Sequence, residues 1–308
     1  MTQPIPERLH IVEGTDWKDA VIALLEPKSP YRPWRHGFGE AHKGDPVAIV
    51  LNTDPASVIT ELGRVGAHGN PAQAVVDFGY AAPGLLELPT LVMLAGFTWG
   101  QDPRHEWQLL GDAAIQMELA LGESRYRWDP ELRFGHTSVT AARILLHSQG
   151  RCDGCDSNID LTGDDARDSV HIHTVDPPQR PAPDPPVRAR ENPWAQCEAE
   201  RGTRGKGKRG KNYGADSITF ERKPPKLPSD WPGVLCRRCV GRMERGSFSS
   251  MLDFRFAQHP ACPECETSRT QRALFGMLAV YDVPPWLDAR GCCVTADIWT
   301  CSGCMYTW

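Results

Sequence analysis

The chain has 308 residues, of which 40% are hydrophobic and 24% charged, and this composition excludes a wholly disordered or fibrous protein. Its length is enough for about two domains. The most apolar stretch, Leu85 to Phe97, is interrupted by Glu87, Pro89 and Gly96 and is shorter than the ~20 apolar residues that a membrane span needs. The start of the chain has no apolar run typical of a signal peptide. We therefore expect a cytoplasmic protein with no membrane partner.

The net charge of −5 conceals a gradient along the chain. Residues 1–150 carry 12 basic and 18 acidic side chains, a net charge of −6, whereas residues 201–245 carry 13 basic and 4 acidic side chains, a net charge of +9. A local basic excess is what neutralisation of nucleic-acid phosphates requires, whatever the overall charge. The basic segment is thus a candidate nucleic-acid contact, and a solvated basic linker is the alternative.

Helices and strands are expected to alternate in the first hundred residues. A helix is predicted over 15–25, capped by Thr15 or Asp16, and a second over 53–66, where apolar residues recur at helical spacing. Strands are predicted for three hydrophobic runs, 46–52, 74–80 and 91–97. Two further helices are predicted over 107–122 and 138–150. This order indicates an α+β fold with a barrel-like module at the N-terminus.

The segment 30–45, PYRPWRHGFGEAHKGD, combines aromatic, basic and glycine residues. Closely spaced glycines suit a loop that approaches a ligand, and aromatic rings can sandwich a planar base. Trp34 and Arg35 are therefore candidate nucleic-acid contacts. Packing of Tyr31, Trp34 and Phe38 within the core is the alternative interpretation.

The stretch GFGEAHKGDPVAIVLNTDPASVITELGRVG resembles the PUA-like superfamily, which includes EVE and ASCH domains. The matching features are Gly44 and Asp45 before a hydrophobic strand and a later segment that returns to Gly63 and Val65. The resemblance implies that residues 1–105 form a β-barrel-type domain that senses nucleic acid. Some members of the superfamily hold a flipped, modified base between aromatic side chains.

The middle of the chain is predicted to join two domains and to contain an insertion. Residues 106–150 are interpreted as a helical linker. Seven prolines among residues 177–193 preclude regular structure, and the basic, glycine-alternating run 202–212 has no apolar residue to bury. We therefore expect a largely disordered insertion at about 177–226. Its candidate phosphate contacts are Lys206, Lys208, Arg209 and Lys211.

Cysteine spacing predicts two zinc sites in the second half of the chain. Four CxxC pairs supply eight thiolates: Cys152 and Cys155, Cys236 and Cys239, Cys262 and Cys265, Cys301 and Cys304. Each pair places two thiolates on one tight turn, and two such turns complete the tetrahedral shell of a zinc ion. Sequential grouping of the pairs predicts two structural Zn²⁺. A redox or disulfide role is the alternative.

The remaining cysteines are given other roles. Residues 259–308 look like a zinc ribbon, in which His259 is a competing ligand. Cys292 and Cys293 are adjacent and are interpreted as small buried side chains, with substitution for another zinc ligand as the alternative. Cys197 lies within the insertion and is expected to be a free surface thiol.

The run ILLHSQGRCDGCDSNIDLTGDDARDSVHIHTVD and the later DWPGVLCRRCVGRMERG resemble the zinc-stapled HNH (ββα-metal) endonucleases. In that family a CxxC precedes a hairpin that bears a His dyad or an Asp-His pair, and a second CxxC opens the helix that closes the metal site. The resemblance implies an HNH-like domain over 151–258. His171 and His173 lie where the dyad should be, one of them as general base, and the remaining residues hold Mg²⁺ or Mn²⁺.

This sequence departs from the family pattern at three places. Ile172 separates the two histidines, so both lie on one side of a strand. The usual CxxCH is replaced at Val240, although Glu244, one turn later, can still bind a hard cation. The expected Asn falls near Asp230 or Trp231, which makes Asp230 the substitute. The alternative is that His171 and His173 are structural histidines.

The leading interpretation is a DNA endonuclease for modification-dependent restriction or phage defence. A reader domain and a cutting domain would then share one chain, with DNA, modified or not, as partner and a homodimer left open. Arginines after Cys236 are expected to face phosphates, or to be solvated charges: Arg237, Arg238, Arg242 and Arg245. The alternative function is non-catalytic, zinc-dependent nucleic-acid binding on a degenerate HNH scaffold. A third interpretation makes the zinc modules a protein-docking platform.

Overall fold

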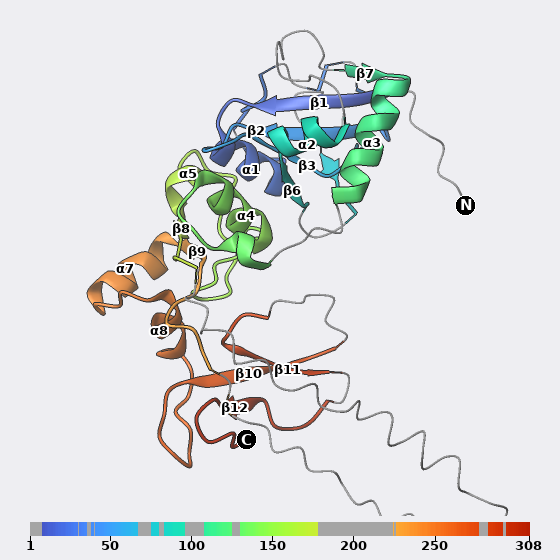
Figure 1. Cartoon of the computed structure of the whole chain (residues 1–308). Coiled ribbons are helices and arrows are strands. Elements are labelled where there is room, and N and C mark those ends of the chain that lie inside the picture. The colour runs from blue at the N-terminus through green and yellow to red at the C-terminus, as the bar shows by residue number, and fades with distance from the viewer. Residues whose placement is uncertain are drawn as a thin grey trace, which may run out of the picture.

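The computed structural model has a mixed α+β fold with several sheets (Figure 1). It describes residues 8–29, 31–35, 38–39, 41–66, 75–79, 83–95, 108–124, 130–177, 224, 226–276, 283–291 and 294–308. Its elements are β1 (Arg8–Gly14), α1 (Trp17–Leu25), β2 (Pro46–Leu51), β3 (Val58–Thr60), β4 (Gly63–Val65), β5 (Val76–Asp77), β6 (Leu85–Glu87), α2 (Leu88–Ala95), β7 (Gln108–Leu110), α3 (Asp112–Ser124), the 3-10 helix η2 (Pro130–Arg133), α4 (Ser138–Ser148), α5 (Ala166–Ser169), β8 (Val170–His173), β9 (Gly233–Cys236), α7 (Arg237–Arg245), α8 (Met251–Phe256), β10 (Thr270–Phe275), β11 (Leu287–Gly291) and β12 (Trp299–Cys301). Within these residues, no helix has the length and apolar character needed to cross a membrane.

The N-terminal sheet is open. Its strands follow the order β5-β4-β2-β1-β7, with β3 paired to β2 and β6 paired to β3. The parallel pair β1 and β2 is connected through α1, and the other pairings are antiparallel. The described strands do not close into a barrel, so the barrel-type expectation is corrected to an open, branched sheet.

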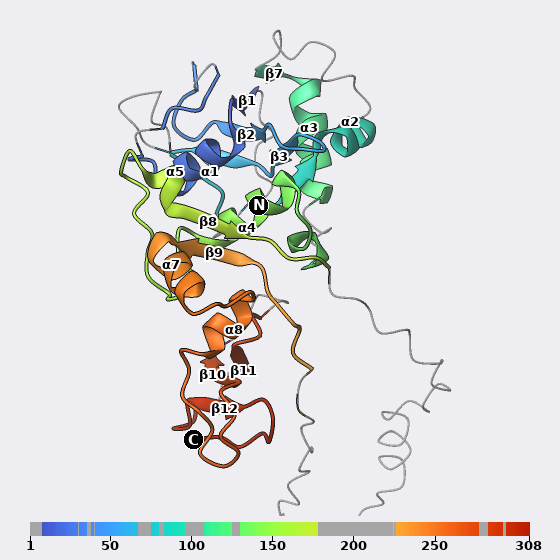
Figure 2. The ribbon, with the colours of Figure 1, turned by 90° about the vertical axis from the view of Figure 1, so that its left-hand side faces the viewer.

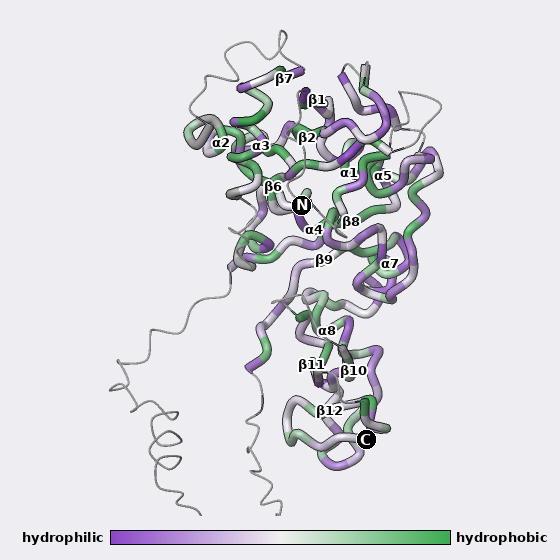
Figure 3. Tube along the Cα trace, turned by 90° about the vertical axis from the view of Figure 1, so that its right-hand side faces the viewer, coloured by the Kyte–Doolittle hydropathy of each residue, from purple (hydrophilic) through white to green (hydrophobic). Residues whose placement is uncertain are grey.

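The side chains of β2 explain why both faces of this sheet are covered. Val47, Ile49 and Leu51 point to the face that packs against α1 and α4, whereas Ala48 and Val50 point to the face that packs against α2 and α3. Figure 2 shows these helices on opposite sides of the sheet. In Figure 3, β2 and α2 carry hydrophobic colouring, as expected of a buried strand and of a helix that covers one of its faces. Such a strand reads as a continuous apolar run.

Three of the predicted elements agree with the structure. Helix α1 begins after Asp16, whose side chain accepts hydrogen bonds from the backbone N–H groups of Lys18 and Asp19. Strand β2 is confirmed, and so is α4, whose N-cap is Thr137. The strand predicted over 74–80 is confirmed in part, as the short β5.

Three predicted elements are wrong in whole or in part. The segment 53–66 is not a helix but contains β3 and β4, and 91–97 is not a strand but contributes to α2. The helix predicted over 107–122 is divided into β7 and α3 by Gly111, whose φ is +53°. A glycine adopts this left-handed conformation without the steric cost that other residues pay, and it ends the strand before the helix begins.

The second part of the chain contains an antiparallel hairpin followed directly by a helix. Strand β8 pairs with β9, with Val170 opposite Cys236 and His173 opposite Gly233, and α7 continues from β9. Helix α4 packs between this hairpin and α1. One hydrophobic cluster, the main hydrophobic cluster, therefore runs from the sheet face covered by α1 through α4 and the hairpin to α7 and α8. The segment 106–150, expected as a linker, supplies β7 to the sheet, α3 to its second face and α4 to the shared cluster.

Polar contacts also join α1 to the hairpin. Lys18 Nζ donates to the carbonyl oxygens of Arg167 and Val170, at 2.8 and 2.9 Å. The Arg167 guanidinium in turn contacts Asp16 Oδ1 at 2.6 Å and Asp19 Oδ1 at 2.5 Å. Each contact links residues about 150 positions apart, so the first helix of the N-terminal sheet is fixed to the strand that bears the two histidines.

Candidate metal centres and histidine pair

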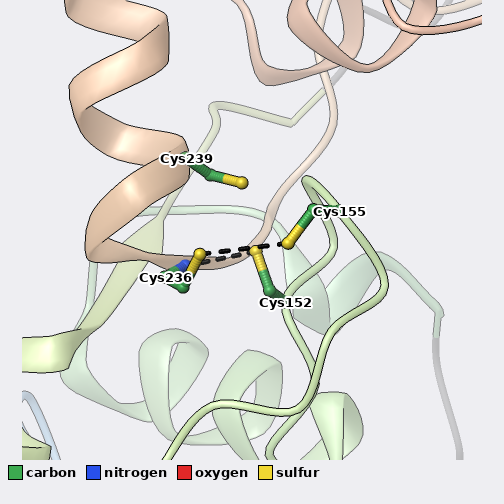
Figure 4. A group of neighbouring side chains, drawn as sticks. All are labelled: Cys152, Cys155, Cys236 and Cys239. Carbon is green, nitrogen blue, oxygen red and sulfur yellow. Dashed lines mark hydrogen bonds between the residues drawn. The ribbon is translucent and has the colours of Figure 1, made fainter.

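The first four-cysteine cluster lies between a turn after α4 and the start of α7. Figure 4 shows the side chains of Cys152, Cys155, Cys236 and Cys239 directed toward one another. Their sulfur atoms all lie within 4.8 Å of one another, and the sulfurs of Cys155 and Cys236 are 3.9 Å apart. The backbone N–H of Cys236 donates to Cys152 Sγ at 3.2 Å. Four thiolates in this arrangement fit the tetrahedral shell of Zn²⁺.

The environments of two of these thiols shift their pKa values in opposite directions. Burial raises the pKa of Cys152 to about 11. Burial also opposes ionisation of Cys155, but hydrogen bonds from Ser157 and from neighbouring cysteines outweigh it and lower its pKa to about 6. Because zinc binding requires thiolates, it would release the proton that Cys152 otherwise keeps.

The CxxC turn of Cys152 and Cys155, the first knuckle, is fixed to the hairpin through Asp153. Its backbone N–H donates to the Val234 carbonyl at 2.7 Å, and its Oδ2 accepts from the Val234 N–H at 2.7 Å. Burial raises the pKa of Asp153 to about 6, against the effect of that hydrogen bond. The knuckle therefore extends the pairing of β9 on the side opposite β8.

Replacement of Gly154 by alanine is expected to weaken the first cluster. A Cβ there would lie 2.8 Å from Leu235 Cδ2 and 3.1 Å from both Cβ and Sγ of Cys239. Overpacking of this kind costs about 1–3 kcal/mol. Gly303 occupies the same place in the CxxC of the second cluster, but a Cβ there would meet its nearest atoms at 3.7 Å. Thermal unfolding should show a lower Tm for Gly154→Ala than for Gly303→Ala, and equal Tm values would contradict the packing argument.

The second cluster groups Cys262, Cys265, Cys301 and Cys304, again with all sulfurs within 4.8 Å. The sulfurs of Cys262 and Cys304 are 3.7 Å apart, and those of Cys265 and Cys301 are 3.5 Å apart. Two backbone N–H groups, of Gly303 and Cys304, donate to Cys301 Sγ at 3.3 Å. The site lies beside a sheet of order β11-β10-β12, in which β10 pairs parallel with β11 and antiparallel with β12.

Both groupings are those predicted from sequential pairing, and each can hold one Zn²⁺. His259 is not among the grouped residues. Its Nδ1 donates to the Thr270 carbonyl at 2.5 Å, and its ring contacts Phe256 and Trp299. Cys197, Cys292 and Cys293 lie outside the described residues.

The two histidines lie on one side of β8. Val170 is buried and Ile172 packs against the main hydrophobic cluster, so the alternation of the strand directs His171 and His173 to the other side. His173 Nε2 lies 2.8 Å from Asp230 Oδ2, across the hairpin from β8. Both side chains are largely buried, with exposed fractions of 23% and 18%. The structure thus joins two of the four predicted catalytic residues.

The ionisation state of Asp230 determines which ring nitrogen of His173 carries the proton. Burial opposes ionisation of Asp230, but hydrogen bonds from His173 and from the backbone of Trp231 and Leu252 outweigh it and lower its pKa. An ionised carboxylate only accepts hydrogen bonds, so His173 Nε2 carries a proton and donates it. In the neutral ring, Nδ1 is then the unprotonated nitrogen.

His171 has a different environment. Its Nε2 is buried and has no hydrogen-bond partner among the described residues. Burial lowers the pKa of His171, and the positive charges of Lys18 and Arg237 lower it further, whereas Glu244 and Asp168 oppose them. Glu244 is exposed on α7, and Val240 packs against the main hydrophobic cluster. Among the described residues, His171, His173, Asp230 and Glu244 do not form a group of three ligand atoms within 4.8 Å.

The candidate phosphate contacts on α7 are exposed. Arg237 pairs with Asp165 at 3.4 Å, and Arg242 donates to Gln258 Oε1 at 3.3 Å and lies over the ring of Phe254. The nearby thiol of Cys155, an acceptor when ionised, raises the pKa of Arg238. The candidates Lys206, Lys208, Arg209 and Lys211 lie outside the described residues, as does most of the expected insertion.

Trp34 and Arg35 lie beside the end of β1. The Trp34 ring packs edge-on against Phe38, with centroids 5.7 Å apart, and it contacts the main hydrophobic cluster. Arg35 Nη1 lies 3.2 Å from Glu13 Oε2. The Trp34 side chain therefore has a packing role, which was the alternative to base binding.

Two polar groups near the histidines were not identified from sequence. Ser250 Oγ donates to Asp230 Oδ1 at 3.0 Å, and the only signal for it is the pattern Ser250-x-x-Asp253 typical of a helix N-cap. His136 lies before α4, where its Nδ1 is 2.7 Å from Thr174 Oγ1 and its Nε2 is 3.1 Å from Asp176 Oδ1. No local pattern places His136 near the end of β8.

Comparisons with protein-family models, with curated proteins and with solved structures find no match for this chain.

Proposed function

We propose that this protein is a DNA endonuclease of the HNH (ββα-metal) type. One observation supports this above all: the β8–β9 hairpin leads directly into α7, a four-cysteine cluster joins this junction to the turn after α4, and His173 of β8 lies 2.8 Å from Asp230, just before β9, in a largely buried pair. The β8–β9 hairpin and α7 would be the ββα unit, and the sheet of β10, β11 and β12 would belong to a zinc ribbon. Both zinc ions are structural, because each cluster fills its shell with protein ligands.

In the proposed mechanism, His173 is the general base. Asp230 holds the Nε2–H of the ring, so Nδ1 can take a proton from the attacking water. His171 and Glu244 would be the protein ligands of Mg²⁺ or Mn²⁺. The Nε2 of His171, which has no hydrogen-bond partner in the described part of the chain, fits such a role, and an ion of this kind usually completes its shell with water and substrate phosphate. When bound, the ion would stabilise the charge that develops on the phosphate and on the leaving oxygen.

Helix α7 and residues 1–105 would also bind DNA. Exposed arginines on α7 would contact the phosphate backbone: Arg237, Arg238 and Arg242. Residues 1–105 would be a PUA-like domain that senses modified DNA. Contacts from α1 to β8 support a reader fixed to a nuclease, as in modification-dependent restriction or phage defence.

The test is cleavage of DNA by the zinc-loaded full chain. Purified protein should cut plasmid or phage DNA, modified or unmodified, when Mg²⁺ or Mn²⁺ is added. The double variant His171→Ala/His173→Ala should lose this activity. His136→Ala removes an imidazole from the exposed His136–Asp176 pair instead and is the matched control, which should cut normally. Full activity of the double variant would contradict the proposal.

A second candidate function is non-catalytic DNA binding on the same scaffold. Val240 favours it, because this aliphatic side chain packs against the core where the HNH family has a histidine. The two functions give different results in one experiment. Binding that weakens steeply with salt, without cleavage under any divalent ion, would favour the second function and exclude the first.

A further inference from the structure

The two oxygens of Asp230 have separate partners. Oδ2 faces His173 Nε2 at 2.8 Å. Oδ1 accepts three hydrogen bonds, from Ser250 Oγ at 3.0 Å, from the Trp231 N–H at 2.8 Å and from the Leu252 N–H at 3.3 Å. The carboxylate is therefore held in one rotamer by Oδ1, which leaves Oδ2 for the histidine.

Ser250 contributes the only side-chain donor among these three. Its hydroxyl has one proton and two acceptors in reach, Asp230 Oδ1 at 3.0 Å and the Ser229 carbonyl at 3.1 Å. The ionised carboxylate is the stronger acceptor, because charge-assisted hydrogen bonds are about twice as strong as neutral ones. A lone pair of the same oxygen accepts from the Asp253 N–H at 3.2 Å, which restricts rotation of the hydroxyl. Ser250 is buried, so bulk water does not compete for it.

The position of Ser250 depends on the first zinc cluster. Ser250 is the N-cap of α8, and α8 is fixed to the first knuckle from its other end. Gln258 Nε2 donates to the Gly154 carbonyl at 2.8 Å, and Arg255 forms an ion pair with Asp156. Ser250 therefore contacts the His–Asp pair from outside the hairpin and α7. Its helix, α8, is held in place by contacts to the CxxC turn of Cys152 and Cys155.

We infer that Ser250 is a positioning residue for His173 and acts through Asp230. The chain Ser250–Asp230–His173 keeps the proton of the imidazole on Nε2 and leaves Nδ1 free. The consequence for catalysis rests on the proposed function, whereas the consequence for the tautomer of His173 does not.

The first test reads the tautomer directly. In the zinc-loaded full chain, ¹⁵N NMR of labelled histidine side chains reports which ring nitrogen carries the proton, and His173→Gln identifies the signals. The wild type and Ser250→Thr should show the Nε2–H form alone. In Ser250→Ala and Ser250→Gly, the backbone N–H groups of Trp231 and Leu252 still bind Oδ1, but the carboxylate loses its side-chain donor and can turn away from Nε2, so a share of the Nδ1–H form should appear beside the Nε2–H form. Glycine is tolerated at an N-cap, so Ser250→Gly preserves the comparison where Ser250→Ala fails to fold.

The second test separates positioning from folding. Cleavage by Ser250→Gly should fall about tenfold in kcat with KM unchanged, because the base is displaced while the DNA contacts remain. Ser250→Thr should restore kcat. Thr137→Ala removes the N-cap of α4, whose hydrogen bond comes from the Thr140 N–H and not from the Asp230 network, and should leave kcat unchanged.

An unaltered Nε2–H tautomer in both variants that lack the hydroxyl would overturn the inference. So would a wild type that lacks this tautomer. If the wild type does not cut DNA, the proposed function fails, and the tautomer alone then decides whether Ser250 positions His173.

Discussion

Replacement of Cys239 by serine is expected to unfold the main hydrophobic cluster, whereas the same replacement at Cys304 is expected to affect chiefly the C-terminal sheet of β10, β11 and β12. Cys239 is fully buried and belongs, with Cys152, to the hydrophobic cluster that extends from the N-terminal sheet to α8. Cys304 is exposed, and the four cysteines of its cluster do not belong to that core, although Trp286 and Leu287 at the start of β11 do. A structural zinc contributes about 10–16 kcal/mol in small zinc-binding units, which is comparable to the whole stability of a domain, about 5–15 kcal/mol.

Two measurements check this expectation. Metal analysis should find two zinc ions per chain in the wild type, retained after mild chelation, and one in each variant. Circular dichroism on heating should show a cooperative transition in the wild type and in Cys304→Ser, and the loss of that transition in Cys239→Ser. Equal thermal stability of the two variants would contradict a central role for the first cluster, and a wild type without zinc would contradict both sites.

The features that sequence predicted well depend on residues close together in the chain. Each CxxC defines half a zinc site by itself, and only the grouping of the halves needs the fold. Likewise, α1 and α4 begin at side chains that cap them, Asp16 and Thr137, so a few neighbouring residues determine where each helix starts.

The predicted elements that are wrong lie where contacts with residues distant in the sequence decide the structure. The segment 53–66 has apolar residues at helical spacing, but Val58 and Ile59 pair with Leu51 and Val50 of β2 instead. β-Branched residues and the glycine at position 63 weaken a helix, so the sheet partner decides between the two structures. In 91–97, the apolar run fits a strand as well as a helix, and Leu91 is buried on the second face of the sheet as part of α2.

The candidate site shows the same division. The order of His171 and His173 along β8 can be read from sequence, and the family resemblance predicts Asp230. Ser250 could not be found in this way, because its hydroxyl meets Asp230 only when α8 lies on the first knuckle. The sequence pattern of a helix cap predicts that Ser250 begins α8. It does not predict that the same side chain contacts Asp230.

The two histidines of β8 should respond differently to substitution. His173→Ala should lower kcat by about 10²–10⁴-fold at every metal concentration, because a general base contributes about that much to the rate. Asp230→Asn should cause a loss of similar size, because the backbone N–H groups of Trp231 and Leu252 fix the amide oxygen at the Oδ1 position and turn the amide NH2 group toward Nε2, which imposes the wrong tautomer.

His171→Ala should instead raise the metal concentration needed for half-maximal cleavage. His171 has a pKa lowered by burial, so its ring is neutral at pH 7, the form that binds a cation, and its Nε2 has no hydrogen-bond partner among the described residues. Removing one ligand weakens metal binding without removing the base, so saturating Mn²⁺ should restore most of the activity. Titration of cleavage against Mn²⁺ for each variant separates the roles. Equal losses that persist at saturating metal in His171→Ala and His173→Ala would contradict the division between ligand and base.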